Sequence, residues 1–208
     1  MNKLGVKAVI SSKARWIVDQ PSENEESNIQ LPISNIVKNL LAKRGIYHTE
    51  EAEKFLSPKL EDLHDPFLFP DMKKAVERIE LAIQKQERIL IFGDYDADGV
   101  TSTALIVEAL RQKNAIVDYY IPNRFTEGYG PNEEAFRQAK EANVSLIITV
   151  DTGIAAVHEA EIANELGIDL IITDHHEAQE KLPPAYAIIH PKLAETYPFD
   201  ELAGVGVS

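Results

Sequence analysis

The feature that most constrains this chain is a series of short apolar runs that alternate with helical patterns from residue 89 onward. The apolar runs, rich in Ile, Leu and Val, occupy residues 89–92, 115–121, 145–150, 168–173 and 185–189. Between the first four of them, helical spacing extends over residues 100–112, 132–141 and 154–166. This alternation predicts an α/β fold with a parallel, doubly wound sheet and right-handed crossovers.

The chain before residue 81 has a different texture. Residues 1–30 show little pattern, and helices are expected over 34–44, over 49–56 with Thr49 as the cap, and after Asp71 as the cap. The sequence therefore predicts a small helical N-terminal region at residues 1–80 and an α/β domain at residues 81–208. No stop signal follows Leu202, which indicates that this domain is truncated at its C-terminal end.

Composition excludes several classes of protein. The chain has 208 residues, of which 44% are hydrophobic and 26% charged, as in ordinary soluble domains. No apolar stretch approaches the ~20 residues of a membrane span. The chain has no cysteine, which excludes disulfides, thiolate nucleophiles and cysteine-ligated zinc. A cytoplasmic enzyme is expected. The net charge of -13 disfavours tight nonspecific binding to nucleic acid, although bound cations would neutralise part of it.

Carboxylates and imidazoles gather where three of the apolar runs stop. The residues concerned are Asp94, Asp96 and Asp98 after the first run, Asp151 after the third, and Asp174, His175 and His176 after the fourth. In an open parallel sheet, the carboxyl ends of the strands form the edge where ligands bind. Carboxylates with one or two imidazoles suit Mn²⁺ or Mg²⁺ better than Zn²⁺. Two such ions about 3.5–4 Å apart can drive phosphoester hydrolysis, so the sequence predicts a metal-dependent phosphoesterase.

The first cluster also has simpler interpretations. In an extended segment Asp94, Asp96 and Asp98 would point to one side, where carboxylates ~7 Å apart repel by about 2 kcal/mol per pair unless a cation lies between them. The alternative is a solvated turn with Asp98 as a helix N-cap. A calcium-binding EF-hand loop is excluded, because Leu105 stands where that loop needs a bidentate Glu.

The other candidates have alternatives too. Asp151 by itself could cap a helix that starts near Gly153, and residues 175–176 could be surface histidines in a loop. Arg124 follows the second apolar run, where it could hold a phosphate or serve as an ordinary loop arginine.

Taken together, these motifs resemble the DHH phosphoesterase superfamily, and within it the RecJ-type single-strand-specific exonucleases. The matching segments are residues 93–102, 122–130, 150–153, 173–176 and 202–207. The resemblance implies a DHH-type domain with two divalent cations, Mn²⁺ or Mg²⁺. The metal ligands that the resemblance implies are Asp96, Asp98, Asp151 and His175. Asp94, from the same motif as Asp96, is a further candidate ligand. Asp151 would bridge the ions and His176 would contact the scissile phosphate, so these two are the expected catalytic residues, with Arg124 a further substrate-binding residue.

The resemblance further implies a 5′-to-3′ exonuclease that acts on single-stranded DNA in recombination and repair. It places a fourth metal-binding motif and further domains beyond Ser208. One alternative is a DHH-family hydrolase of short oligonucleotides, cyclic dinucleotides or pyrophosphate, and another is a catalytically silent binding module. The helical N-terminal region and Tyr95 in the first motif favour the exonuclease, and the intact metal set argues against the silent module.

Overall fold

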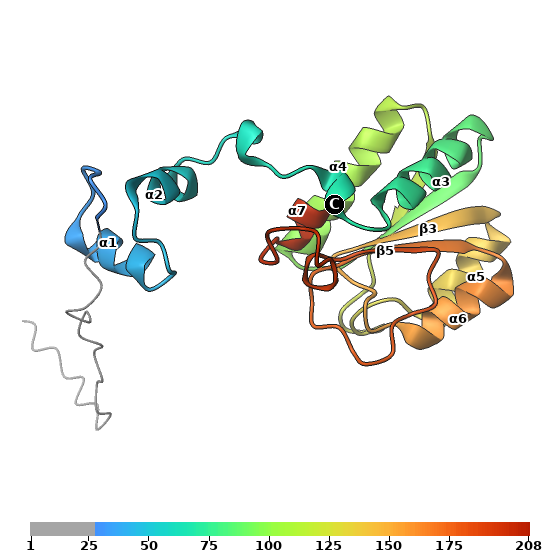
Figure 1. The fold of residues 1–208 in the computed structure, drawn as a ribbon. Coiled ribbons are helices and arrows are strands. Elements are labelled where there is room, and N and C mark those ends of the chain that lie inside the picture. The colour runs from blue at the N-terminus through green and yellow to red at the C-terminus, as the bar shows by residue number, and fades with distance from the viewer. Residues whose placement is uncertain (1–27) are drawn as a thin grey trace, which may run out of the picture. The chain divides into compact units, whose positions relative to one another are not determined.

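The structure, a computed structural model, describes residues 28–208 of the chain (Figure 1). The weakly patterned start predicted for residues 1–30 lies largely outside them. The chain divides into two compact units between Leu63 and His64. The division lies before the helix that starts at Met72, whereas the sequence pattern placed a domain boundary within that helix, at residue 80.

The first unit is a small helical assembly. Its elements are α1 (Asn35–Ala42), α2 (Thr49–Leu56) and the short 3₁₀ helix η1 (Leu60–Asp62). The two predicted α-helices are confirmed, and Ile29, Leu41 and Ala52 form a small core. The prediction that Thr49 caps α2 is wrong, because its hydroxyl accepts the N–H of Gln30 and donates to the carbonyl of Asn28.

The second unit is built on a parallel sheet. Its strands are β1 (Arg88–Gly93), β2 (Ile116–Tyr120), β3 (Val144–Val150), β4 (Asp169–Thr173) and β5 (Ala187–Ile189). The strands lie in the order β2-β1-β3-β4-β5, and every neighbouring pair is parallel. The predicted parallel sheet is therefore confirmed, with each predicted apolar run forming one strand.

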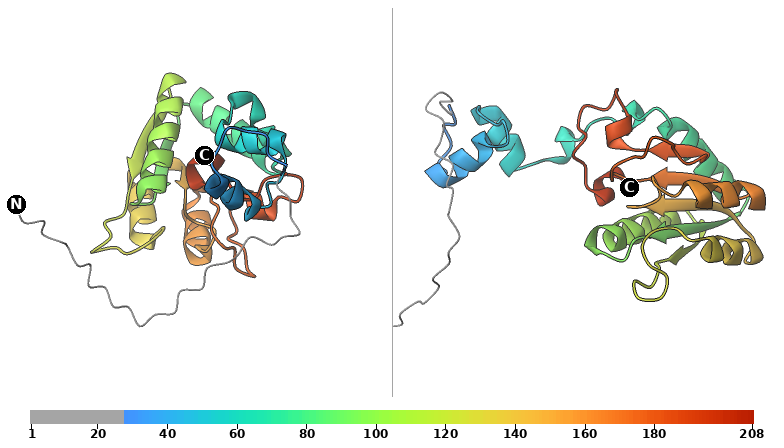
Figure 2. Two further views of the ribbon diagram at one scale, coloured as in Figure 1. Left: turned by 90° about the vertical axis from the view of Figure 1, so that its left-hand side faces the viewer. Right: turned by 90° about the horizontal axis from the view of Figure 1, so that it is seen from below.

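Helices cover both faces of this sheet (Figures 1 and 2). The helical elements are η2 (Pro66–Leu68), α3 (Met72–Gln84), α4 (Ala97–Gln112), α5 (Glu133–Glu141), α6 (Val157–Leu166), η3 (Pro191–Leu193) and α7 (Gly204–Val207). α3 and α4 pack on one face and α5 and α6 on the other, each pair with its own apolar core. The central strands are buried on both faces, which explains why they read as continuous apolar runs. No helix among residues 28–208 is both long and apolar enough to cross a bilayer.

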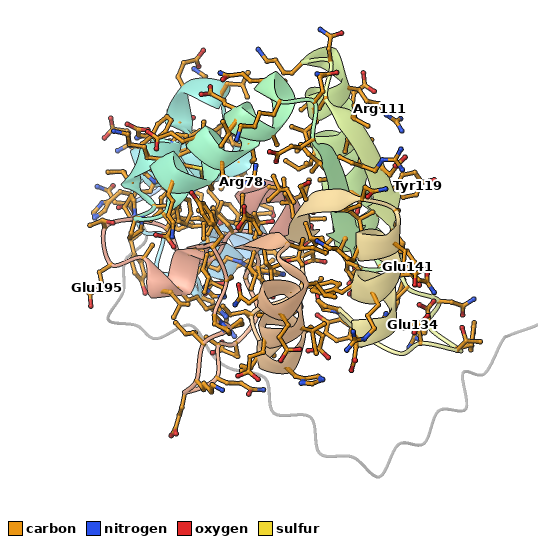
Figure 3. All side chains as sticks on the ribbon, turned by 90° about the vertical axis from the view of Figure 1, so that its right-hand side faces the viewer. Arg78, Arg111, Tyr119, Glu134, Glu141 and Glu195 are labelled. Carbon is orange, nitrogen blue, oxygen red and sulfur yellow. The ribbon has the colours of Figure 1, made fainter. Side chains whose placement is uncertain are left out.

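α3 is tied to the sheet by polar contacts as well as by packing. The carboxylate of Asp71 accepts the N–H of Ile188 in β5 rather than a helix N–H, so the prediction that Asp71 caps α3 by its side chain is wrong. Arg78 is a buried residue of α3 (Figure 3). Its guanidinium donates hydrogen bonds to Asp169 at 2.5 Å and to Glu87 at 2.7 Å. These contacts hold α3 on the sheet at the edge opposite the acidic clusters.

Candidate metal centre

Four strands of the sheet end at the same level. Gly93, Val150, Thr173 and Ile189 are register partners across neighbouring strands. The residues that follow them in the chain form a row along the carboxyl edge of the sheet: Asp94, Asp151, Asp174 and His190. β2 pairs with one side of β1 and β3 with the other, so the strand order reverses at β1. Open α/β sheets bind ligands in the crevice at the carboxyl end of such a reversal.

The first acidic cluster occupies the turn from β1 into α4. Asp94 is 2% exposed, and its Oδ1 accepts the N–H of Tyr95 at 2.6 Å. Asp96 is the N-cap of α4, because its Oδ1 accepts the N–H groups of Asp98 and Gly99 at 2.9 and 3.0 Å. The predicted extended segment is therefore wrong. The helix begins at residue 97, so Asp98 lies in its first turn and Asp96 takes the capping role proposed for Asp98.

Asp151 lies at the end of β3 in an unusual environment. It adopts the left-handed conformation, with φ of 60°, and its side chain is 1% exposed. Neither carboxylate oxygen accepts a hydrogen bond, although Oδ1 is 3.1 Å from Nε2 of His175. Burial, with the charges of Asp98 and Asp96, raises the pKa of Asp151 to about 7. A buried carboxylate that accepts no hydrogen bond destabilises the folded protein unless a cation neutralises its charge. Since α6 starts at residue 157, the helix-cap interpretation of Asp151 fails.

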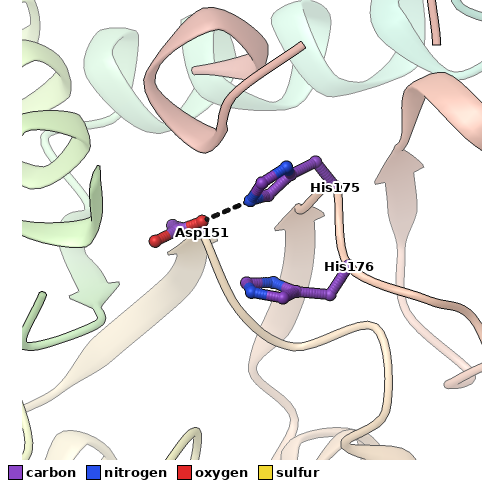
Figure 4. A group of neighbouring side chains, drawn as sticks. All are labelled: Asp151, His175 and His176. Carbon is purple, nitrogen blue, oxygen red and sulfur yellow. Dashed lines mark ion pairs between the residues drawn. The ribbon is translucent and has the colours of Figure 1, made fainter. Parts of the chain in front are cut away.

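The two histidines are held by Asp174. Its Oδ1 accepts the N–H of His175 at 2.7 Å and of His176 at 3.1 Å, and it also lies 2.7 Å from Nδ1 of His176. Its Oδ2 accepts the N–H of Ile154 at 2.9 Å. Both imidazoles therefore turn toward Asp151 (Figure 4). Burial by itself lowers the pKa of His176, but the carboxylate of Asp174 outweighs it and the pKa is raised.

The sequence pattern places Asp174 in the third acidic and imidazole cluster but predicts no role for it. His190, which the sequence pattern predicts to be a structural or surface histidine, is fully buried, and its Nε2 lies 2.8 Å from the carbonyl oxygen of His176. The signal that would have identified both is their position, since each directly follows a strand at the level of Asp94 and Asp151.

The acidic and imidazole groups fit a metal centre. Among the described residues, two sets of possible ligand atoms lie within 4.8 Å of one another: Asp94, Asp96 and Asp151, and Asp151, His175 and His176. Asp151 belongs to both sets, and its two oxygens lack hydrogen-bond partners. Such a carboxylate would have one oxygen for each of two cations. The oxygen-rich donor set with imidazole suits Mn²⁺ or Mg²⁺.

Two predicted site residues do not belong to these sets, although Oδ2 of Asp98 lies 3.7 Å from Nε2 of His175. Both oxygens of Asp98 accept backbone N–H groups, from Gly204 at 2.7 Å and Val205 at 2.8 Å. Arg124 lies in the loop after β2, with its guanidinium carbon 5.4 Å from the ring centroid of Tyr95. The roles predicted for Asp98 and Arg124 therefore stay predictions.

A cavity of about 540 Å³ opens beside the centre. Asp94, Asp96, Asp174 and His176 line it together with residues 152–156 and Tyr129. The ring of Tyr129 meets those of Tyr95 and His176 edge-on, at centroid distances of 6.3 and 6.1 Å. Part of the centre therefore borders a cavity whose volume is that of a small-molecule site, while Asp151 lies behind it in the core.

Comparison with known proteins agrees with this fold and this set of residues. Residues 88–208, more than half of the chain, match the DHH family, N-terminal domain, and the chain belongs to the DHH family. Among its relatives, the single-stranded-DNA-specific exonuclease RecJ of Bacillus subtilis (strain 168) is 55% identical over 203 residues, which are 96% of this chain and 26% of that protein. RecJ of Escherichia coli (strain K12) is 39% identical over 188 residues, 89% of this chain and 32% of that protein.

Solved structures show the same similarity. A crystal structure of exonuclease RecJ bound to manganese superposes with a TM-score of 0.64 at 34% identity, over 70% of this chain and 37% of that one. RecJ of Thermus thermophilus in complex with Mn²⁺ gives a TM-score of 0.63 at 30% identity, over 80% of this chain and 22% of that one. The chain spans about a quarter to a third of the length of the two RecJ relatives in sequence.

Proposed function

We propose that this chain is the catalytic part of a metal-dependent phosphodiesterase that degrades single-stranded DNA from its 5′ end, in recombination and repair. The observation that carries the proposal is Asp151, a buried carboxylate without hydrogen-bond donors that is shared by two sets of possible ligands. The similarity to RecJ along nearly the whole chain supports the choice of substrate.

In this proposal the ligands of two Mn²⁺ or Mg²⁺ ions are Asp94, Asp96, Asp98, Asp151 and His175. When bound, the ions activate water and neutralise the charge that builds up on the phosphate. His176 binds the scissile phosphate. Asp174 holds its Nδ1 and raises its pKa, which favours the imidazolium, and the imidazolium donates Nε2–H to a phosphate oxygen.

The DNA strand is proposed to enter through the cavity beside the centre. Arg124, stacked near Tyr95, supplies a cation for a backbone phosphate. Because the chain carries a net charge of -13, local groups of this kind and other parts of the protein must provide the affinity for DNA. A cytoplasmic location follows from the proposed role in DNA repair.

The test is digestion of 5′-labelled single-stranded DNA with Mn²⁺ by the full-length protein that contains this chain. The Asp151→Asn variant should lose activity by at least about 100-fold, since it removes the charge shared by both ligand sets. Asp118→Asn is the matched control, because Asp118 is exposed on the edge strand β2 and its loss should leave activity unchanged. Full activity of Asp151→Asn would rule out the proposed centre.

The same assay separates the alternatives. Release of mononucleotides from dinucleotides, with no cleavage of longer strands, would favour the small-substrate hydrolase. Binding of DNA without cleavage under any divalent cation would favour the silent module.

A further inference from the structure

The loop that carries His175 and His176 is fastened to the strand beside it (Figure 4). At the start of this loop, the N–H of Asp174 donates to the carbonyl of Ile189, the last residue of β5, at 3.2 Å. Two residues further on, the carbonyl oxygen of His176 lies 2.8 Å from Nε2 of His190. The end of β5 and the residue that follows it therefore hold the backbone of the loop at residues 174 and 176.

The contact with His176 determines which nitrogen of the His190 ring carries a hydrogen. A carbonyl oxygen can only accept a hydrogen bond, so Nε2 of His190 is the donor. His190 is 1% exposed, and this burial lowers its pKa and favours the neutral ring with a single N–H. That N–H is committed to the backbone of His176, so Nε2 of His190 is not available to bind a metal ion.

The position of the His176 imidazole depends on two kinds of contact. Oδ1 of Asp174 lies 2.7 Å from Nδ1 of His176, which sets the rotation of the ring. The side chain of His176 is 44% exposed, so packing does not hold it in place. The reach of its Nε2 therefore also depends on where the backbone of residue 176 lies. That backbone is held at its N–H by Asp174, at 3.1 Å, and at its carbonyl by His190.

We propose that His190 is a positioning residue that, through its hydrogen bond to the carbonyl of His176, holds the His176 imidazole where it contacts the scissile phosphate. His190 itself contacts neither metal nor DNA in this proposal. The inference rests on the proposed function, because it needs the phosphate-binding role of His176. It gives a role to the last member of the row formed by Asp94, Asp151, Asp174 and His190.

The test compares His190→Met with His190→Gln in the full-length protein that contains this chain. The two new side chains have nearly the same length and volume, but only glutamine places an N–H donor near the position of Nε2. With Mn²⁺ and single-stranded DNA, kcat should fall by about tenfold or more in His190→Met, because a small displacement of a catalytic group is costly. In His190→Gln it should stay within about threefold of the wild-type value, because the hydrogen bond is restored.

A double-mutant cycle with His176→Gln separates a positioning role from a general loss of stability. If His190 acts through His176, His190→Met should cost less than about twofold in kcat when residue 176 is already glutamine. Arg78→Met is the control for stability, because its ion pairs lie at the opposite edge of the sheet. It should leave kcat within about twofold of its starting value in both backgrounds.

Three results would overturn the proposal. Wild-type kcat in His190→Met would show that the hydrogen bond is not needed. Equal losses in His190→Met and His190→Gln would show that the shape of the ring matters rather than its N–H. Losses from His190→Met and His176→Gln that multiply in the double variant would show that His190 acts independently of His176.

Failure of the proposed function would look different. In that case the wild-type protein would leave single-stranded DNA uncut, or His176→Gln would keep full activity. Hydrogen exchange at the amide of His176 needs neither metal nor DNA and tests the positioning contact by itself. This exchange should become about threefold or more faster in His190→Met and stay near the wild-type rate in His190→Gln. An unchanged rate in His190→Met would contradict the proposal whatever the activity.

Discussion

Replacing Asp151 by asparagine is expected to stabilise the metal-free protein while it abolishes metal binding. The wild-type carboxylate is buried, accepts no hydrogen bond and lies near the charges of Asp98 and Asp96. Asparagine has nearly the same shape without the charge. It also tolerates the left-handed backbone of this position, where φ is 60°, better than alanine does. The substitution thus removes the charge with little other disturbance.

The magnitude follows from the pKa of Asp151. The shift from the ordinary value of 3.8 to about 7 corresponds to about 4 kcal/mol of unfavourable free energy for the charged form in the folded state. Because neighbouring carboxylates titrate together with Asp151, we expect about 2–4 kcal/mol for the single substitution. The pKa of Asp151 is higher in the folded than in the unfolded state. The Asp151 carboxyl group therefore destabilises the folded wild type least below about pH 4, and its destabilising effect grows as the pH rises to about 7.

Urea unfolding in EDTA, at pH 5 and at pH 8, measures this effect. At pH 8 Asp151→Asn should be more stable than the wild type, and at pH 5 most of the difference should disappear. Addition of Mn²⁺ at pH 8 should stabilise the wild type and leave the variant unchanged. Equal stability of the two proteins at pH 8 without metal would refute the reasoning, because it would mean that the Asp151 carboxylate is adequately solvated or paired.

Three further substitutions probe other parts of the unit. Asp174→Asn removes a carboxylate oxygen that accepts hydrogen bonds from the turn carrying His175 and His176. The free energy of unfolding in urea should fall by about 2–3 kcal/mol, and kcat on single-stranded DNA by about tenfold or more. Gly153→Ala should lower stability by about 2 kcal/mol or more in the same experiment, since φ is 111° and the new Cβ would lie 2.6 Å from Oγ1 of Thr149. Arg78→Met should cost about 2–3 kcal/mol by leaving Asp169 and Glu87 without their partner, with Mn²⁺ affinity in calorimetry unchanged. A loss of metal affinity in Arg78→Met would contradict the separation of the two edges of the sheet.

The sheet was predictable because its physical signal is local. The central strands, buried on both faces, must be apolar throughout, and each of the five runs in the sequence became one strand. The capping residues were not predictable in the same way. Thr49 and Asp71 have the right side chains for a cap, but backbone groups of distant segments compete for them, namely residues 28–30 and Ile188. A competition of this kind is decided by tertiary structure.

The candidate site was predictable in part, since the carboxyl edge of a parallel sheet gathers whatever follows its strands. Asp94, Asp96, Asp151 and the His pair lie there as the pattern indicated. The position of Asp98 depends on where α4 begins and on its hydrogen bonds to the turn at residues 204–205. Neither can be inferred from the spacing of residues in the sequence. The contribution of Asp174 depends on its buried hydrogen bonds, which an acidic residue in a motif does not reveal.

The register of the strands has a consequence for how the protein is made. The groups that form the centre follow β1, β3 and β4, and the sheet brings them level only once β4, the last of these strands in the chain, has paired with β3. A nascent chain on the ribosome therefore cannot assemble the centre until residues 175 and 176 have emerged from the exit tunnel. Binding of cations at this edge of the sheet must therefore await the synthesis of the fourth strand.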